Sequence, residues 1–338
     1  MDNALSGHLE SALKYRSALL TQLHAEETDA YRLFHGSVEG HPGLTVDRYG
    51  NLLLVQSFHS PLQEPQLKTL EAFYAQAFPG LTFIYNDRSQ AHSRIGNQLS
   101  PKMLAAAQEP HRARELGVNY LIQARHAGQD PWLFLDLRAA RRRVMKEIRE
   151  KSLLNVFSYT CGVGVAAAKA GASSVVNVDF ARSSLLVGEE NARINDLPIQ
   201  MRFVLSDAFP ALRQFSGLGQ PTLVRGKRLP HFERLKKQQF DMVFLDPPPY
   251  AKSPFGVVDL IHDYQALFKP ALLCVAVGGS MICCNNVAQV SREVWIDQLE
   301  HSARKALRPI REVEWITPEN DFPSPDERPP LKMALLRL

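Results

Sequence analysis

The segment 244–253 reads Phe-Leu-Asp-Pro-Pro-Pro-Tyr-Ala-Lys-Ser and is the most informative part of the sequence. It follows an apolar stretch typical of a buried strand, and three consecutive prolines cannot continue the hydrogen-bonded ladder of a sheet. Asp246 and the carbonyls of Pro247 and Pro248 would form a rigid row of acceptors, beside which Tyr250 could stack on a flat ring. Such a row suits a planar substrate that bears an amine, such as a nucleobase turned out of its stack. The alternative is a stiff turn with Tyr250 in the core.

A second group of candidate residues lies where a predicted strand meets a helix near residue 160. Gly162 and Gly164 would let backbone N–H groups approach a ligand closely at the carboxyl end of this strand. The third glycine of the dinucleotide fingerprint GxGxxG is absent, which favours a smaller adenosyl ligand. Asp179 stands 17 residues after Gly162 and could accept both ribose hydroxyls, and Asp207 could accept from an adenine amine. The alternative is that the glycines only make a turn and the aspartates cap helices.

The elements that position these residues alternate regularly from residue 153 onward. We predict strands at 153–158, 175–179, 201–205, 240–245 and 281–284, and helices up to 170 and at 181–194, 257–276 and 291–306. Apolar strands that alternate with helices indicate a parallel sheet with helices on both faces, an α/β Rossmann-like fold. The last two strands, 312–317 and 331–338, have no helix between them, so one of them should run antiparallel to the rest.

The first 125 residues predict a smaller α/β domain, so we expect two domains, 1–125 and 126–338. Apolar spacing indicates a helix from residue 5 to about 30, and Gly50-Asn51 between two apolar runs indicates a hairpin over 44–55. The remaining predicted elements are helices at 62–78, about 101–107 and 137–151, and strands at 81–85, 118–124 and 132–135.

Composition excludes several classes of protein. Hydrophobic residues make up 45% of the chain, which argues against disorder, and the formal net charge of +4 is only mildly basic. Its 4 cysteines show no disulfide framework and no metal-ligand spacing, so we expect a reduced protein without a metal. The N-terminus has no apolar signal core, and no run reaches the roughly 18 apolar residues that span a bilayer. We therefore expect a cytoplasmic protein without membrane contact, and the sequence is compatible with a homodimer.

With these residues in view, the chain resembles class I S-adenosylmethionine-dependent methyltransferases, and more narrowly the bacterial 23S rRNA large-subunit methyltransferase family. Members of that family include a cytosine-C5 enzyme and the guanine-N7 half of a fused double methyltransferase. The segments that carry the resemblance are Gly43–Gly50, Gly128–Arg138, Asn155–Ala168, Asp246–Ser253 and Asp321–Lys332. The resemblance implies an adenosylmethionine site made of Phe157, Ser158, Tyr159, Thr160, Gly162, Gly164, Asp179, Asp207 and Asp246, closed by Asp136 and Arg138.

This sequence departs from the cytosine-C5 members in two places. Those members carry a PUA-like RNA-binding domain, for which the first 30 residues are too few. They also place a nucleophilic cysteine seven positions beyond a Gly-Gly pair, and here that position holds Asn286. The run Cys284-Asn285-Asn286 is instead similar to the Ser-Asn-Asn of the guanine-N7 half.

The residue at the position of the nucleophilic cysteine decides which atom of the base can be methylated. Cytosine C5 needs a thiolate to add to the ring first, whereas guanine N7 has a lone pair that can attack the sulfonium methyl directly. Asn285 and Asn286 could read a guanine edge. We therefore predict guanine N7 of 23S rRNA, with cytosine C5, through Cys284 or Cys283 as nucleophile, as the alternative.

Two basic segments could hold the RNA. The first contains Arg138, Arg141, Arg142, Arg143, Lys146, Arg149 and Lys151, and the second contains Arg225, Lys227, Arg228, Arg234, Lys236 and Lys237. Charge runs are usually solvated faces, but the second one interrupts the sheet region and is better placed to grip phosphate. Lys252 could contact a flanking phosphate.

Other classes of function remain as alternatives. A nicotinamide-dependent dehydrogenase would need the missing glycine, and a ribosome-assembly factor without catalysis would tolerate Asp246→Ala. A methyltransferase of proteins or small molecules also stays open, because the fold does not fix the substrate.

Overall fold

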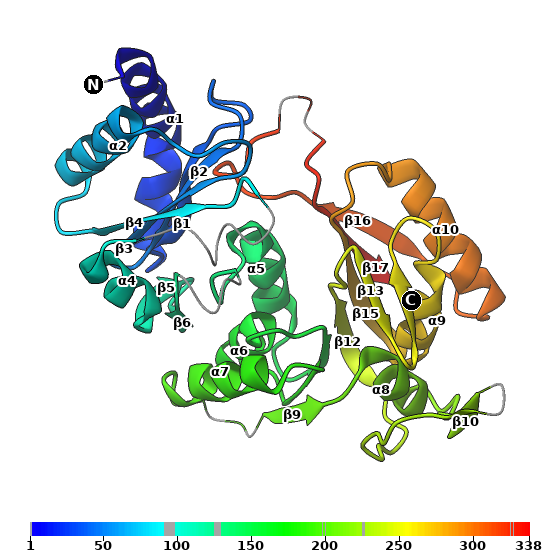
Figure 1. Cartoon of the computed structure of the whole chain (residues 1–338). Helices are drawn as coiled ribbons and strands as arrows, with labels where there is room; N and C mark the ends of the chain where they lie inside the picture. Colours follow the sequence, from blue (N-terminus) through cyan, green and yellow to red (C-terminus); the bar gives the residue numbers. More distant parts are fainter. Residues whose placement is uncertain are drawn as a thin grey trace. The chain divides into compact units, whose positions relative to one another are not determined.

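The computed structural model describes residues 2–90, 99–124, 130–197, 199, 201–224, 227–324, 326 and 328–338. Contacts divide the chain into two compact units, 1–138 with 318–328, and 139–317 with 329–338 (Figure 1). The boundary thus falls at residue 138, where the sequence suggested 125, and the segment 318–328 returns to the first unit. The physical reason is Asp321, whose carboxylate accepts from Arg138 (2.6 Å) and from the backbone N–H of Arg32 (3.0 Å).

The first unit contains a four-stranded sheet in the order β1-β2-β3-β4. The bounds are α1 Asn3–Ala25, β1 Ala30–His35, β2 Leu44–Tyr49, β3 Leu52–Ser57, α2 Glu64–Ala77, β4 Thr82–Asp87, α4 Pro101–Gln108, β5 His111–Glu115, β6 Val118–Ile122 and the 3-10 helix η1 Leu135–Leu137. Strands β2 and β3 form the predicted hairpin, in which Gly50 has a φ of +59° and a Cβ would stand 2.2 Å from the carbonyl of Arg112. Strand β4 is parallel to β3, and α2 makes the crossover.

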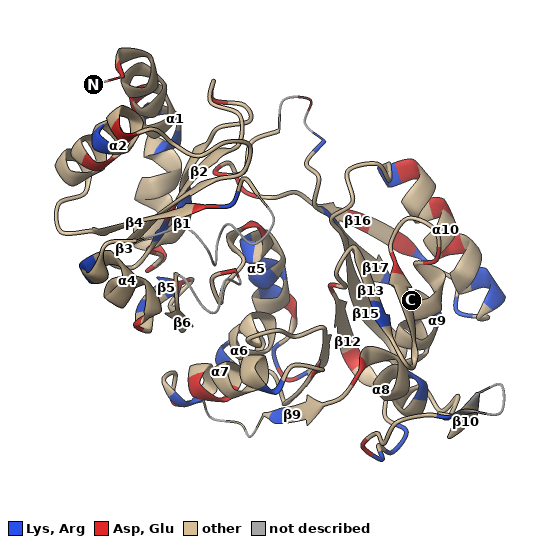
Figure 2. Cartoon of the chain, viewed as in Figure 1, with Lys and Arg blue, Asp and Glu red and all other residues tan. Residues whose placement is uncertain are grey.

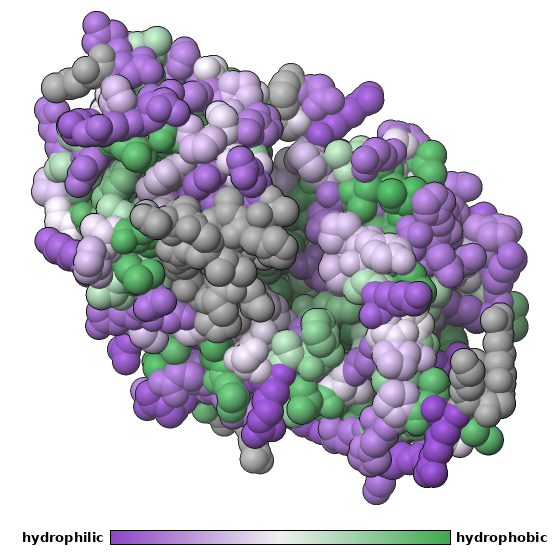
Figure 3. Space-filling model, in the orientation of Figure 1, coloured by the Kyte–Doolittle hydropathy of each residue, from purple (hydrophilic) through white to green (hydrophobic). Residues whose placement is uncertain are grey.

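Apolar stripes on two helices cover one face of this sheet. Leu5, Leu9 and Leu23 of α1 join Leu70 and Tyr74 of α2 in one core with the strands. The visible outer face over these helices is mostly hydrophilic (Figure 3), as expected for helices that bury a single stripe. The sequence analysis missed β1 and β5, and its predicted strand at 132–135 is wrong because these residues lead into η1.

The second unit is the predicted Rossmann-like layer structure. Its sheet has the order β16-β17-β15-β12-β7-β8-β9, with α8, α9 and α10 on one face and α5, α6 and α7 on the other (Figure 1). The bounds are α5 Arg138–Glu147, β7 Ser152–Val156, α6 Gly162–Lys169, β8 Ser174–Asp179, α7 Arg182–Arg193, β9 Arg202–Leu205, α8 Ala208–Phe215, β10 Leu223–Val224, β11 Lys227–Arg228, β12 Phe240–Leu245, β13 Tyr250–Ser253, β14 Gly256–Asp259, α9 Gln265–Leu273, β15 Val275–Asn285, α10 Arg292–Lys305, β16 Glu312–Ile316 and β17 Lys332–Arg337.

The antiparallel ending is confirmed, because β17 runs antiparallel to both β15 and β16. The other four strand pairs of this sheet are parallel: β15–β12, β12–β7, β7–β8 and β8–β9. One prediction here is wrong. The helix expected over 257–276 begins only at Gln265, and the residues before it form the antiparallel hairpin β13–β14. Ser253 to Gly256 make its turn, and the β-branched pair Val257-Val258 extends the returning strand.

Candidate active site

The predicted site residues follow adjacent strands at one edge of the second sheet. Leu245 at the end of β12 pairs with Val156 of β7 and with Cys283 of β15, and Val156 pairs with Val178 of β8. Because these four strands are parallel, the residues that come after them all leave the sheet at its carboxyl edge. Ligands of open α/β sheets bind at this edge.

The loop between β7 and α6 has an uncommon backbone. Phe157, Tyr159 and Cys161 have φ values of +59°, +49° and +62°, so every second residue is left-handed although none is glycine. Such residues cost of order 1–3 kcal/mol each and persist where the surroundings hold them. Asn191 on α7 helps to hold the loop, because its side chain donates to the carbonyl of Thr160 (3.1 Å). Hydrogen bonds within the protein also fix this loop. The N–H of Ser158 donates to the carbonyl of Val178 (3.0 Å), and the N–H of Cys161 donates to the carbonyl of Ser158 (2.7 Å).

Asp179 ends β8 beside this loop. Its side chain is 8% exposed and accepts from the N–H groups of Tyr159 and Ala181, at 2.8 Å each. Burial raises the pKa of this carboxyl, and the hydrogen bonds from the backbone oppose part of the shift. The N–H of Phe180 also bonds this carboxylate. Because a carboxylate can accept about four hydrogen bonds, a ribose hydroxyl remains a suitable donor.

Phe180 follows Asp179 and was missed by the sequence analysis. It is 72% exposed, which is unusual for a phenylalanine at the end of a buried strand. An exposed ring next to a buried carboxylate offers an apolar face beside a polar anchor. This pair fits the adenosine part of S-adenosylmethionine, so the donor set and the surface agree with that cofactor.

The two glycines of the loop play different parts. A Cβ at Gly164 would lie 2.1 Å from Oδ1 of Asn177, which also accepts from Asn155 (2.9 Å). Gly164 therefore allows α6 to pack closely on β8, and this packing accounts for it without a ligand. Gly162 is the first residue of α6, where backbone N–H groups have no partner within the helix.

Asp207 caps a helix, which the sequence analysis gave as the alternative to a ligand contact. It is the N-cap of α8, and its side chain accepts from the N–H of Phe209 (2.8 Å). This bond uses one oxygen of the carboxylate, and the other can still accept from a ligand.

The residues after β12 begin with the predicted row of acceptors, Asp246, Pro247 and Pro248. Asp246 is half-buried and Pro247 is buried, and the carbonyl of Pro249, the next residue after the row, accepts from the N–H of Leu260 (3.1 Å). Tyr250 begins β13 and is 64% exposed, so it is not a core residue. Its ring is available to a planar partner.

At the end of β15, burial distinguishes Asn286 from the three residues before it. Cys283 and Cys284 are fully buried, and burial raises the pKa of the Cys283 thiol despite a hydrogen bond from Tyr264. Asn285 is also fully buried, and its amide bonds the carbonyl of Leu260 (3.4 Å) and the N–H of Val287 (2.9 Å). Of the two asparagines, only Asn286 is exposed.

Lys332 was not singled out as a site residue, although it ends the last segment of the resemblance. It is 4% exposed, and its ammonium donates to the carbonyls of Val287 (2.8 Å) and Pro330 (2.9 Å). Burial lowers the pKa of Lys332. The side chain fixes the turn that presents Asn286.

Asp136 and Arg138 belong to the first unit by their contacts. Asp136 lies in η1, and Arg138 is 1% exposed. The three guanidinium nitrogens of Arg138 bond Glu319 (2.7 Å), the carbonyl of Ala30 (3.0 Å) and Asp321 (2.6 Å). These three partners hold Arg138 within the first unit, and the cofactor contact that the resemblance implied for it stays a prediction.

The two basic segments differ in how far their side chains are exposed. Arg141 is 2% exposed, and Arg143 pairs with Glu147 and Glu314, so much of α5 is not a free basic face. In the second segment Arg228, Arg234, Lys236 and Lys237 are exposed. Figure 2 shows basic positions, in blue, along the irregular chain beside β10. Arg225 and the side chain of Lys227 lie outside the described residues, as do Gly128 and Gln129.

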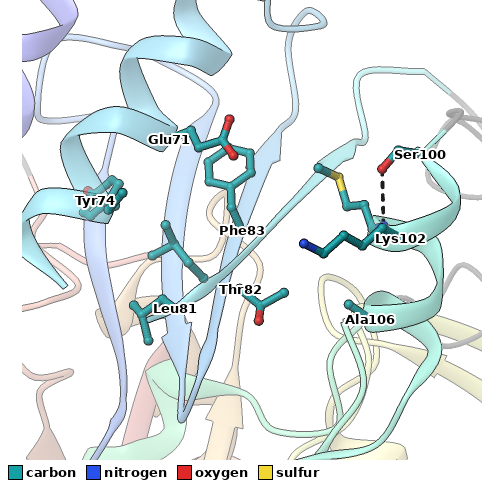
Figure 4. A pocket seen from close by; sticks show the side chains of 11 residues that line it. Glu71, Tyr74, Leu81, Thr82, Phe83, Ser100, Lys102 and Ala106 are labelled. Carbon is teal, nitrogen blue, oxygen red and sulfur yellow. Dashed lines mark hydrogen bonds between the residues drawn. The ribbon is translucent and has the colours of Figure 1, made fainter. Parts of the chain in front are cut away.

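A pocket of about 410 Å³ lies in the first unit, between α2, α4 and β4. Figure 4 shows Glu71 and Lys102 on opposite sides of it, with Phe83 between them. None of the predicted site residues lines this pocket. Among the described residues, no helix is long and apolar enough to cross a membrane, and no three His, Cys, Asp or Glu side chains are grouped to hold a metal.

The chain is similar in sequence and in structure to known methyltransferases. A sequence model described as S-adenosylmethionine-dependent methyltransferase matches residues 31–337. "Ribosomal RNA large subunit methyltransferase I" of Shigella flexneri is 25% identical over 94% of this chain and 75% of its own. The protein of the same name from Aeromonas salmonicida is 29% identical over 87% of this chain and 70% of its own. A solved chain described as a methyltransferase in complex with SAH aligns with a TM-score of 0.78 and 21% identity, over 99% of this chain and 81% of that one.

Proposed function

Because the chain belongs to the S-adenosylmethionine-dependent methyltransferase family, we propose that it methylates a base of large-subunit ribosomal RNA in the cytoplasm. The RNA class is supported by the names of its curated relatives. The atom that we propose is N7 of guanine, and methylation of cytosine C5 is the alternative.

The residues that would hold the cofactor follow β7 and β8. We expect Asp179 to accept from the ribose hydroxyls and Phe180 to cover one face of the adenine, while the backbone of the β7–α6 loop binds the amino-acid end. When bound, S-adenosylmethionine supplies an electrophilic methyl group on its sulfonium sulfur. Asp207 has one carboxylate oxygen left for the adenine amine.

The residues that would hold the base follow β12. We expect Tyr250 to stack on the base, and Asp246 and the carbonyls of Pro247 and Pro248 to accept from its amine. Methylation at N7 gives the guanine ring a positive charge, which the Asp246 carboxylate would stabilise electrostatically. N7 carries no proton that must leave before or after it attacks the methyl group, so orientation of the two reactants is the main task of the protein.

The choice of nitrogen over carbon rests on one observation, the arrangement at the end of β15. A nucleophilic cysteine is a partly exposed thiolate, yet Cys283 and Cys284 are fully buried and the pKa of Cys283 is raised. Asn286, the exposed residue of this run, has both a donor and an acceptor for the edge of a guanine.

The test is methylation of unmodified 23S rRNA with labelled S-adenosylmethionine, followed by digestion to nucleosides and identification by mass. We expect label in 7-methylguanosine. The Cys283→Ala/Cys284→Ala variant should keep at least half of this activity, whereas Asn286→Ala should lower it about tenfold or more. Thermal unfolding of each variant controls for loss of the fold.

The alternative gives the opposite pattern. Label in 5-methylcytidine that disappears in the double cysteine variant would establish carbon methylation and overturn the nitrogen proposal. Label in no nucleoside, with bound cofactor still detectable, would contradict naked rRNA as the substrate.

A further inference from the structure

Residues 228–237, which we call the basic strap, carry an uneven charge. The sequence Arg-Leu-Pro-His-Phe-Glu-Arg-Leu-Lys-Lys has one acid, Glu233, and that side chain pairs with Arg202 of β9 (3.1 Å). Arg228, Arg234, Lys236 and Lys237 are exposed, and none of the four forms an ion pair within the described part of the chain. Their charge is therefore not neutralised by the protein itself.

The strap has a fixed course although residues 229–239 form neither helix nor strand. Gln214 of α8 is 8% exposed, and its amide holds the strap at two points. It donates to the carbonyl of Glu233 (3.0 Å) and accepts from the N–H of Leu235 (3.1 Å). Phe232 is 9% exposed and Leu235 packs against the core, so the apolar side chains point inward while the cations remain outside.

The strap is also connected to the hairpin that carries Tyr250. The ring of Phe232 meets that of Phe255 edge to face, with centroids 6.0 Å apart, and Phe255 lies in the turn between β13 and β14. The guanidinium of Arg234 lies over the Phe232 ring at 4.9 Å. Along β13 the side chains alternate, so Tyr250 and Lys252 are exposed on the same side. Exposed cations therefore lie both on the hairpin, at Lys252, and on the strap, at Arg234.

We propose that the basic strap binds the phosphodiester backbone of the RNA strand whose target base stacks on Tyr250. This inference rests on the proposed function, because it takes the substrate to be RNA. The net charge of the whole chain is only +4, so attraction of a polyanion must come from a local group of cations such as this one. An exposed aromatic ring at the end of the cationic surface favours a nucleic acid over an acidic protein, because bases stack on such rings.

The test compares two variants that lose the same charge within the same unit. Arg234→Gln/Lys236→Gln/Lys237→Gln neutralises the strap, and Lys269→Gln/Arg304→Gln/Lys305→Gln neutralises exposed positions on α9 and α10. Binding of a fluorescein-labelled single-stranded RNA and of transcribed 23S rRNA is measured at several salt concentrations. Binding of S-adenosylmethionine and thermal unfolding are measured beside it.

We expect the strap variant to bind both RNAs about tenfold more weakly at fixed salt. Each lost phosphate contact lowers the slope of log affinity against log salt by about 0.7 for single strands, so three contacts lower it by about 2. The control variant should stay within about twofold of the unmodified protein. Cofactor binding should be the same in all three proteins.

Equal RNA binding and equal salt slopes in the two variants would overturn the proposal. So would strap-dependent binding of a polyglutamate peptide that competes with RNA, which would identify an acidic protein as the partner. The two proposals fail separately. If rRNA is methylated and the strap variant works as well as the control, only the strap proposal is wrong. If no nucleoside is labelled but RNA binding depends on the strap, the methylation proposal is wrong and the strap still binds RNA.

Discussion

Two groups of cations in this protein look alike in the sequence and have opposite surroundings. Arg16 and Arg138 are 0% and 1% exposed in the first unit, whereas Arg234, Lys236 and Lys237 of the basic strap are exposed in the second. The density of positive charge is similar in the segments 138–151 and 228–237, so it does not distinguish Arg138 from the strap. Their partners do, because a buried charge needs carboxylates close by and an exposed one needs only water.

The buried group is organised around the carboxylates that return with residues 318–328. Asp321 is 0% exposed and accepts from Arg138 and from the backbone of Arg32, while Glu319 takes the remaining edge of Arg138. Arg16 pairs with Glu39. Removal of one partner from such a group leaves an uncompensated charge inside the protein, which is the costly case.

The largest effect is therefore expected for Asp321→Ala. Loss of this carboxylate should lower the free energy of unfolding of the first unit by about 3–5 kcal/mol. The measurement is urea denaturation followed by hydrogen exchange of peptides from β1 and β2. Asp326→Ala removes an exposed acid from the same segment and should cost less than about 0.5 kcal/mol. Equal costs for the two variants would show that the buried group does not stabilise the fold.

A smaller effect should appear as a pH dependence at His35. Burial, helped by Arg32 and Arg16, lowers the pKa of His35 to about 3, and the Arg32 guanidinium lies 2.9 Å from its Nδ1. The unfolded chain binds this proton near pH 6.5, so the stabilising contribution is complete above pH 6.5 and falls as the pH drops toward 3. Between pH 7 and pH 5 the loss should be about 1–2 kcal/mol.

The control for this prediction is His35→Gln, which cannot titrate. The difference in unfolding free energy between the unmodified protein and the variant should shrink as the pH falls from 7 to 5. A difference that stays constant over this interval would mean that the proton binds equally well to the folded and unfolded chains.

These comparisons show which features local sequence can predict. The hairpin at Gly50-Asn51, the alternation after residue 153 and the antiparallel last strand were predictable, because turn chemistry and periodicity act over a few residues. Strand β14 was mistaken for the start of a helix because short apolar runs fit both periods. At the candidate site Tyr250 and Asn286 are exposed, and the roles predicted for them stay predictions.

Features that depend on distant partners could not be predicted. The surroundings of Arg138 depend on Asp321, 183 positions along the chain, and the burial of Asn285 depends on the carbonyl of Leu260. The use of Gly164 for packing depends on Asn177 of the next strand. In each case the partner lies in a distant part of the sequence, so no local pattern could have predicted it.

The smallest effect on stability is expected for Lys236→Gln in the basic strap. An exposed lysine without an ion pair contributes little to folding, so the free energy of unfolding should change by less than about 0.5 kcal/mol in urea denaturation. The slope of RNA affinity against salt should nevertheless fall by about 0.7, because one phosphate contact is lost. This combination is the reverse of Asp321→Ala, which should cost stability and leave that slope unchanged in the protein that remains folded. A lysine whose removal destabilised the fold by several kcal/mol would place the strap with the buried arginines, and the contrast between the two groups would no longer hold.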